Sequence, residues 1–179
     1  MLVVLKPADI YVLAGLVGRD RKWTYRQLGA GLHVPHALVQ RAIARAGEAD
    51  LYSEPRRLVH IPHFEEFASH ALRFVAPARL GPIVPGVPAA WAAPPMSNLI
   101  RSSRDEPQPV WPTAQTSSVR GQALEPLHPA AIGAARDDPE LAQMLSLLDS
   151  LRAGDVRVRR VASEELHNRL REVSARQGA

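Results

Sequence analysis

Residues 23–46 read WTYRQLGAGLHVPHALVQRAIARA. At the start of this stretch, Thr24 and Gln27 have capping-box spacing, in which a hydroxyl and an amide side chain satisfy free backbone groups at a helix start. Two leucines at helical spacing follow, and they predict a short helix. After a turn, apolar residues recur at helical spacing and predict a second helix over residues 35–46. The stretch is therefore expected to fold as two short helices joined by a tight turn.

The sequence on either side of this stretch predicts three more elements. An earlier helix is expected over residues 7–17, because a proline opens it and a glycine follows it. Residues 51–53 and 57–59 are short extended runs on either side of a turn-rich tip, which is typical of a β-hairpin. A further helix is expected over residues 62–75. The predicted order is helix, helix, helix, hairpin, helix.

The middle of the chain has a different composition. Residues 76–127 contain ten of the sixteen prolines, which exclude long regular helices. Apolar side chains persist there, so we expect an extended segment laid along a folded surface and not a flexible linker. Trp91 and Trp111 are expected to pack in the core, with the lining of a small-molecule pocket as the alternative. Only residues 101–106 and 113–118 are expected to be free of that surface.

The last part of the chain returns to helical patterns. Asp138 and Pro139 are a capping residue and a first-turn proline, and a sustained apolar stripe follows them. Asp155 can cap a second helix with a stripe of its own. Two such helices are expected to pack as a hairpin and to dock on the amino-terminal segment or on a partner.

The predicted fold class is mainly α with a small β-hairpin. Three parts are expected: a compact helical segment over residues 1–75, the proline-rich extended segment over residues 76–127, and a helical region over residues 128–179. The chain has no cysteine, which excludes a disulfide framework, a thiolate zinc site and a cysteine nucleophile. No apolar run approaches the roughly 18 residues of a membrane span. We therefore expect a cytoplasmic protein without a membrane partner.

The positive charge is confined to one part of the chain. The net charge is +4, and residues 1–60 hold all of the excess, with nine basic and five acidic side chains. The rest of the chain is balanced. Localised positive charge on a small domain is typical of a protein that binds a polyanion such as nucleic acid.

Four pieces of the first 75 residues carry a resemblance to a known family. They are the helix opening at 23–28, the turn at 32–34, the helix at 39–46 and the Leu51-Tyr52 pair before the hairpin. Together they resemble the winged helix-turn-helix domain of bacterial transcriptional regulators. The resemblance implies that the third helix enters the major groove of DNA and that the hairpin forms the wing.

The resemblance also implies which residues contact DNA. Gln40 and Arg41 would face the bases, because glutamine suits the N6 and N7 edge of adenine, and arginine suits the O6 and N7 edge of guanine. Five further residues would lie near the DNA backbone or at the wing tip, where arginine can reach phosphate or a narrow minor groove: Arg26, His36, Arg45, Arg56 and Arg57.

Other chemistry has weaker signals. His63, Glu66 and His70 are spaced three and four apart on one predicted helix face, which suits either a divalent metal or an exposed polar face. Because a fourth ligand is lacking, we assign no metal. Asp137 and Asp138 are adjacent carboxylates, but helix capping explains them better than acid–base catalysis. No phosphate-binding glycine loop or nucleophile motif is present, so we expect a non-enzymatic protein without a cofactor.

These observations leave three functional hypotheses. The leading one is a cytoplasmic DNA-binding transcriptional regulator that binds double-stranded DNA, with residues 128–179 forming a homodimer or binding a protein partner. The alternative is an antitoxin-like interaction protein that neutralises a partner and autoregulates its operon. Its organisation resembles antitoxins paired with nucleotidyltransferase-type toxins. The third is a winged domain used only for protein contacts.

Overall fold

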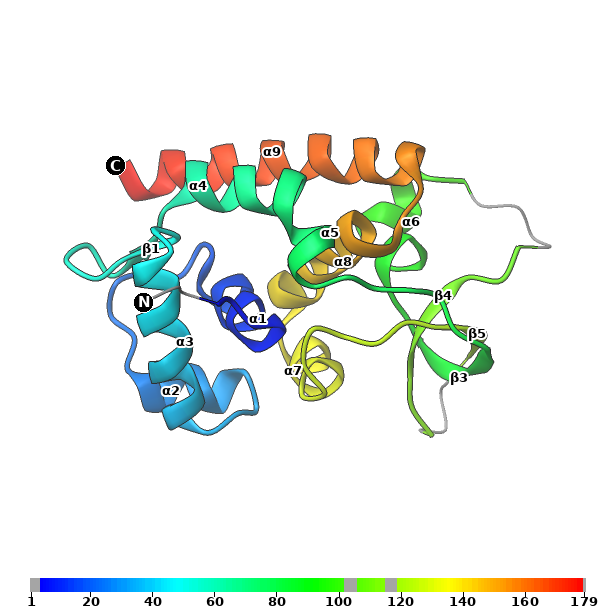
Figure 1. Ribbon diagram of the computed structural model, residues 1–179, viewed down its shortest axis with the longest axis horizontal. Coiled ribbons are helices and arrows are strands. Elements are labelled where there is room, and N and C mark those ends of the chain that lie inside the picture. Colours follow the sequence, from blue (N-terminus) through cyan, green and yellow to red (C-terminus); the bar gives the residue numbers. More distant parts are fainter. Residues whose placement is uncertain (1–3, 102–105, 115–118, 179) are drawn as a thin grey trace.

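The computed structural model describes residues 4–101, 106–114 and 119–178 (Figure 1). The two stretches expected to be free of the folded surface lie mostly outside the described residues. In Figure 1, α1 and α8 occupy the middle of the molecule, with α2, α3 and a β-hairpin at one end and a small sheet at the other. The long helix α9 runs along one side.

The amino-terminal elements follow the predicted order. They are α1 (Pro7–Leu16), α2 (Tyr25–Gly31), α3 (His36–Glu48), β1 (Tyr52–Ser53) and β2 (Leu58–Val59). The predicted capping box opens α2: the Thr24 hydroxyl accepts from the Gln27 N–H at 3.1 Å, and the Gln27 side-chain oxygen accepts from the Thr24 N–H at 2.9 Å. The hairpin strands pair antiparallel, with Tyr52 opposite Val59. The predicted β-hairpin is confirmed.

The next helix is a continuous rod with a π-helical turn in its middle. It consists of α4 (Ile61–Glu66), the π-turn η1 (Phe67–Ala71) and α5 (Leu72–Val75). The rod lies beside α9 in Figure 1. Polar contacts between described residues join them: Ser69 Oγ lies 3.1 Å from Ser163 Oγ, and His167 Nδ1 lies 2.7 Å from a Glu65 carboxylate oxygen. The amino-terminal elements are thereby joined to the end of the chain.

The proline-rich segment forms a sheet of its own, which the sequence did not predict. The strands β3 (Ile83–Pro88), β4 (Pro109–Pro112) and β5 (Val119–Ala123) pair around a closed ring, β4 and β5 in parallel. Two short helices, η2 (Ala90–Ala92) and α6 (Met96–Leu99), follow β3.

The prolines are compatible with this sheet because their carbonyl groups accept hydrogen bonds from backbone N–H groups. The carbonyls of Pro82, Pro85 and Pro109 accept from the N–H groups of Ala123, Thr113 and Ala89 at 2.9, 3.1 and 3.0 Å. Proline lacks an N–H, so it is tolerated in a strand where only its carbonyl is needed.

The carboxy-terminal region is helical, as predicted. It consists of α7 (Ala131–Asp137), α8 (Pro139–Ala153) and α9 (Val156–Gly178). Asp138 caps α8, because its Oδ1 accepts from the N–H groups of Glu140 and Leu141 at 3.1 Å. Asp155 accepts from the Val158 N–H at 2.8 Å at the start of α9. Helices α8 and α9 pack together as the expected hairpin.

One continuous hydrophobic core contains residues of all three parts of the chain. Its centre is formed by α1 and α8, which are in contact, and every α8 residue from Met144 to Arg152 is buried. In α1, every residue from Asp9 to Leu16 is buried. The hairpin of α8 and α9 therefore docks on the amino-terminal elements, through α8 in the core and through the contacts of α9 with α4 and η1.

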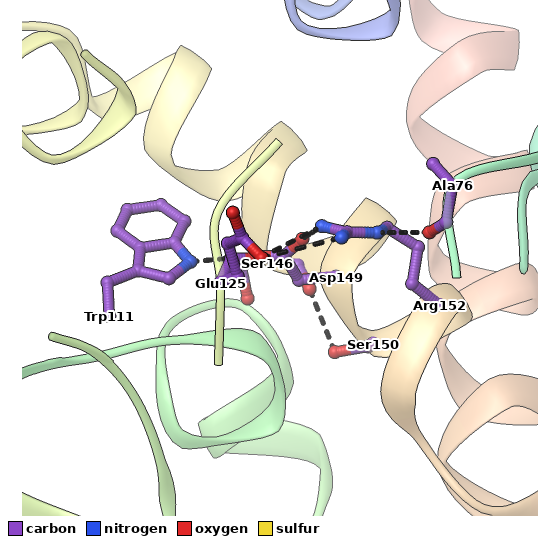
Figure 2. Close-up of polar contacts among 7 residues, drawn as sticks. All are labelled: Ala76, Trp111, Glu125, Ser146, Asp149, Ser150 and Arg152. Carbon is purple, nitrogen blue, oxygen red and sulfur yellow. Dashed lines mark hydrogen bonds and ion pairs between the residues drawn. The ribbon is translucent and has the colours of Figure 1, made fainter. Parts of the chain in front are cut away.

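A buried polar cluster joins the middle and end of the chain (Figure 2). The Asp149 carboxylate accepts from Trp111 Nε1 at 2.7 Å and from Arg152 Nη1 at 2.6 Å. Arg152 Nε donates to the Ala76 carbonyl at 2.8 Å, and its terminal nitrogens approach the Glu125 carbonyl. Burial raises the pKa of Asp149, while the guanidinium and the indole N–H oppose that rise by stabilising the carboxylate. The cluster thus links β4 and two loops to α8.

His128 provides a pH-dependent contribution to stability. Its ring stacks on Tyr11 at 5.3 Å between centroids, and its Nδ1 accepts from the Ala130 N–H at 3.1 Å. Burial lowers the pKa of His128 from its ordinary value of 6.5. The unfolded chain therefore takes up a proton on His128 at a higher pH than the folded chain does. The contribution of neutral His128 to the free energy of unfolding is thus present above pH 6.5 and is lost as the pH falls through the pKa of His128 in the folded chain.

We expect the free energy of unfolding of the wild type to fall between pH 7.5 and pH 5 by more than that of His128→Phe, which keeps an aromatic ring. Urea denaturation at each pH measures this difference. His70→Phe, at an exposed position, serves as the matched control and should follow the wild type. Parallel curves for the wild type and His128→Phe would contradict the assignment.

Candidate nucleic-acid interface

The outward face of α3 carries the polar side chains that the sequence placed there. His36, Gln40 and Arg41 are exposed. The opposite face packs into the core through its apolar residues, which are Val39, Ala42, Ile43 and Ala46. An amphipathic helix of this kind has one face for packing and one face available for a ligand. The face predicted to read bases is thus exposed to solvent.

A tight turn sets the position of α3 against α2. His33 adopts a left-handed conformation, with a φ of 54°, at the point where the chain reverses. In α2, a Cβ on Gly29 would lie 2.7 Å from the Val34 carbonyl oxygen, so only glycine allows this approach. The two helices are therefore held closely together by backbone geometry.

The guanidinium of Arg45 is already paired with a carboxylate inside the fold. Its Nε and Nη2 donate to the two carboxylate oxygens of Asp9 at 2.8 and 2.6 Å, and Asp9 is fully buried. This two-point hydrogen bond raises the pKa of Arg45. In the sequence analysis, Arg45 was placed near the DNA backbone. Its contact with Asp9 instead anchors α3 to α1.

Arg57 is also held within the fold, in the turn of the hairpin. Its Nη2 donates to the Trp23 carbonyl at 2.5 Å, and its guanidinium carbon lies 4.5 Å from the centroid of the Trp23 ring. Trp23 also meets Tyr52 edge-on at 6.4 Å, and burial raises the pKa of Tyr52 to about 12. Arg57 thereby fixes the hairpin to the start of α2, and the neighbouring Arg56 is exposed at the tip.

Five of the seven predicted DNA-contacting residues are exposed, on α2, on α3 and at the hairpin tip: Arg26, His36, Gln40, Arg41 and Arg56. These elements lie together at one end of the molecule in Figure 1. Because Asp9 is neutralised by Arg45 in the interior, it does not offset the charge of the exposed arginines. The α2–α3–hairpin face, as we call these five residues, carries three exposed arginines.

The back of the α2–α3 turn docks on the carboxy-terminal helices. His33 Nε2 lies 3.0 Å from Asp137 Oδ2, and Arg19 Nη2 lies 3.5 Å from Asp138 Oδ2. The Tyr11 hydroxyl donates to the Leu32 carbonyl at 2.9 Å. Capping was the predicted role for the two aspartates; the structure adds these contacts to residues more than a hundred positions away, which sequence spacing does not reveal.

The other candidate groups do not form a site in the described residues. His63 Nδ1 lies 2.8 Å from the Asp50 carbonyl oxygen and 3.1 Å from its carboxylate. In the part of the chain that the structure describes, no grouping of three or more histidine, aspartate or glutamate residues suited to a metal occurs. Trp111 packs in the core and also lines a groove.

No protein-family model, curated protein or solved structure matched this chain in the comparisons. Within residues 4–101, 106–114 and 119–178, no helix is both long enough and apolar enough to cross a membrane.

Proposed function

We propose that this chain is a DNA-binding transcriptional regulator that acts by binding and not by catalysis. The observation that carries the proposal is the outward face of α3, where Gln40 and Arg41 are exposed. The opposite face of this helix is packed into the hydrophobic core. In this proposal the amino-terminal elements are a winged helix-turn-helix domain, with α3 in the major groove and the hairpin as the wing. The protein would act in the cytoplasm on double-stranded DNA, as a homodimer or with a protein partner.

The proposed contacts divide into two kinds. Gln40 and Arg41 read base edges, since a helix in the major groove presents its exposed side chains to them. Arg26, His36 and Arg56 lie near phosphates and set the position of the protein on the duplex. Arg45 and Arg57 hold α3 and the hairpin in place from within, because their guanidinium groups are already bonded to Asp9 and Trp23.

A salt titration tests the proposal. If Arg26 and Arg56 each neutralise one phosphate, log affinity should fall with log salt at a slope of about −1.8, so Kd for random duplex DNA should rise about 12-fold between 50 and 200 mM salt. Fluorescence anisotropy of a labelled duplex measures this. The Arg26→Gln, Arg56→Gln double variant should lose most of the slope, whereas Arg160→Gln, at an exposed position on α9, should keep it. A Kd that does not change with salt concentration, or an absence of binding, would contradict the proposal.

A second candidate is the antitoxin-like interaction protein, in which the same domain autoregulates and other surfaces neutralise a partner. Its specific support is the exposure of two apolar side chains on the small sheet, Ile83 at 43% and Val119 at 47%. Apolar side chains exposed on a strand suit a protein contact.

The Ile83→Lys, Val119→Lys double variant separates these two candidates. The antitoxin-like reading predicts that it loses a stable complex with the product of the neighbouring gene and keeps its DNA affinity. Size-exclusion chromatography of the co-expressed pair measures the complex. If the wild type forms no complex with that product, the plain regulator is favoured.

A further inference from the structure

A groove of about 500 Å³ lies between the small sheet, the residues that flank η2, and the helices α7 and α8. Val87, Trp111, Ile132 and Ala135 form much of its apolar lining. Binding sites for small molecules commonly have volumes of about 300 to 1,000 Å³ and mainly apolar walls with a few polar groups. The size and lining of the groove therefore suit a compact organic ligand.

Trp111 is a rigid part of this lining. Its indole N–H is directed at Asp149 in Figure 2 and bonds to it at 2.7 Å, and the side chain is almost wholly buried. The ring is therefore held by the buried polar cluster and does not need to be ordered when a ligand arrives. A preformed aromatic wall favours a flat apolar partner.

The charge of the groove indicates a second property of the ligand. Arg136 is the one charged side chain among the described lining residues, and no acidic side chain lines the groove there. Its nearest carboxylate partner is Asp137, with Nε and Oδ1 4.0 Å apart, at the limit of an ion pair. Asp137 also faces His33 at 3.0 Å. The guanidinium at the rim is thus suited to an anionic group.

We propose that this groove binds a flat, apolar organic acid, with its ring system between Trp111 and α7 and its carboxylate at Arg136. The ligand would contact the face of α7 formed by Ile132, Ala135 and Arg136. The other face of α7 meets the α2–α3 turn: a Cβ on Gly133 would lie 2.9 Å from His33 Nδ1. Helix α7 therefore connects the groove to the turn. That connection becomes regulation of DNA binding only if the proposed function holds.

The test uses 2-naphthoate and its uncharged amide, 2-naphthamide, as probes in ¹H–¹⁵N NMR titrations of the full chain. Both should shift the Trp111 indole and the Val87 and Ala135 amides, with the acid binding at least about fivefold more tightly than the amide. The His33 amide should shift as well, although His33 does not line the groove. These titrations contain no DNA, so their result does not depend on the proposed function.

Three variants sharpen the test. Arg136→Gln should reduce the preference for the acid to less than about twofold, whereas Arg79→Gln, a matched exposed arginine outside the groove, should leave it unchanged. Ala142→Trp should fill the groove and weaken both probes. Absence of shifts at the groove residues with millimolar probe, or equal affinity for acid and amide, overturns the ligand site. Groove shifts without a His33 shift overturn the connection through α7.

Discussion

Replacing Asp149 with alanine is expected to lower the free energy of unfolding by about 3–5 kcal/mol, because it leaves a buried guanidinium without its counter-charge. The Arg152 side chain is only 5% exposed, so water cannot take over the lost interaction. The indole N–H of Trp111 would lose its acceptor at the same time. Since Arg152 also bonds to the Ala76 carbonyl, the loss affects the region where the amino-terminal elements meet α8.

Urea denaturation followed by circular dichroism measures this effect. Glu164→Ala, at an exposed position on α9, is the control and should change stability by less than about 0.5 kcal/mol. The Asp149→Leu, Arg152→Met double variant removes both charges and should be less destabilised than Asp149→Ala. A loss below about 1 kcal/mol in Asp149→Ala would show that the ion pair is not isolated from water.

The sequence predicted the elements whose signals are local. The capping box at Thr24 and Gln27 and the cap at Asp138 each depend on residues three positions apart, and both helices begin where these signals placed them. The sheet of the proline-rich segment was not predicted because the residues that pair across its strands are far apart in the sequence, such as Val84 opposite Gly121. Proline content excluded helix correctly over most of the segment, but it does not reveal which carbonyls are used as acceptors.

The same distinction applies to the candidate interface. Helical spacing predicted that Gln40 and Arg41 face away from the core, and the structure confirms their exposure. Spacing alone did not reveal that Arg45 reaches Asp9, a residue 36 positions earlier. One signal was available: residues 10–17 read IYVLAGLV, which is apolar on every side and predicts a fully buried helix. A carboxylate at the start of such a helix needs a partner.

Arg41→Ala is expected to weaken binding to a preferred DNA site by about 1–3 kcal/mol, or roughly 5- to 150-fold in Kd, and to relax sequence preference at one base pair. The exposed guanidinium lies on the face of α3 that has no packing role, so the variant should fold normally. Arg56→Ala at the hairpin tip should weaken binding more uniformly across sequences, because a phosphate contact carries no base information. Equal and negligible effects from both variants would refute the placement of α3 and of the wing.

The most direct test of the central claim, that the outward face of α3 reads DNA bases, combines a protein change with a base change. A preferred site is first selected from a random duplex pool, and each guanine in it is then replaced with 7-deazaguanine, which lacks the N7 acceptor. Binding is measured by fluorescence anisotropy for the wild type and for Arg41→Ala. We predict that one such replacement weakens the wild type and leaves Arg41→Ala unaffected, because the contact is already missing. If every replacement affects both proteins equally, Arg41 does not contact a guanine and the claim is contradicted.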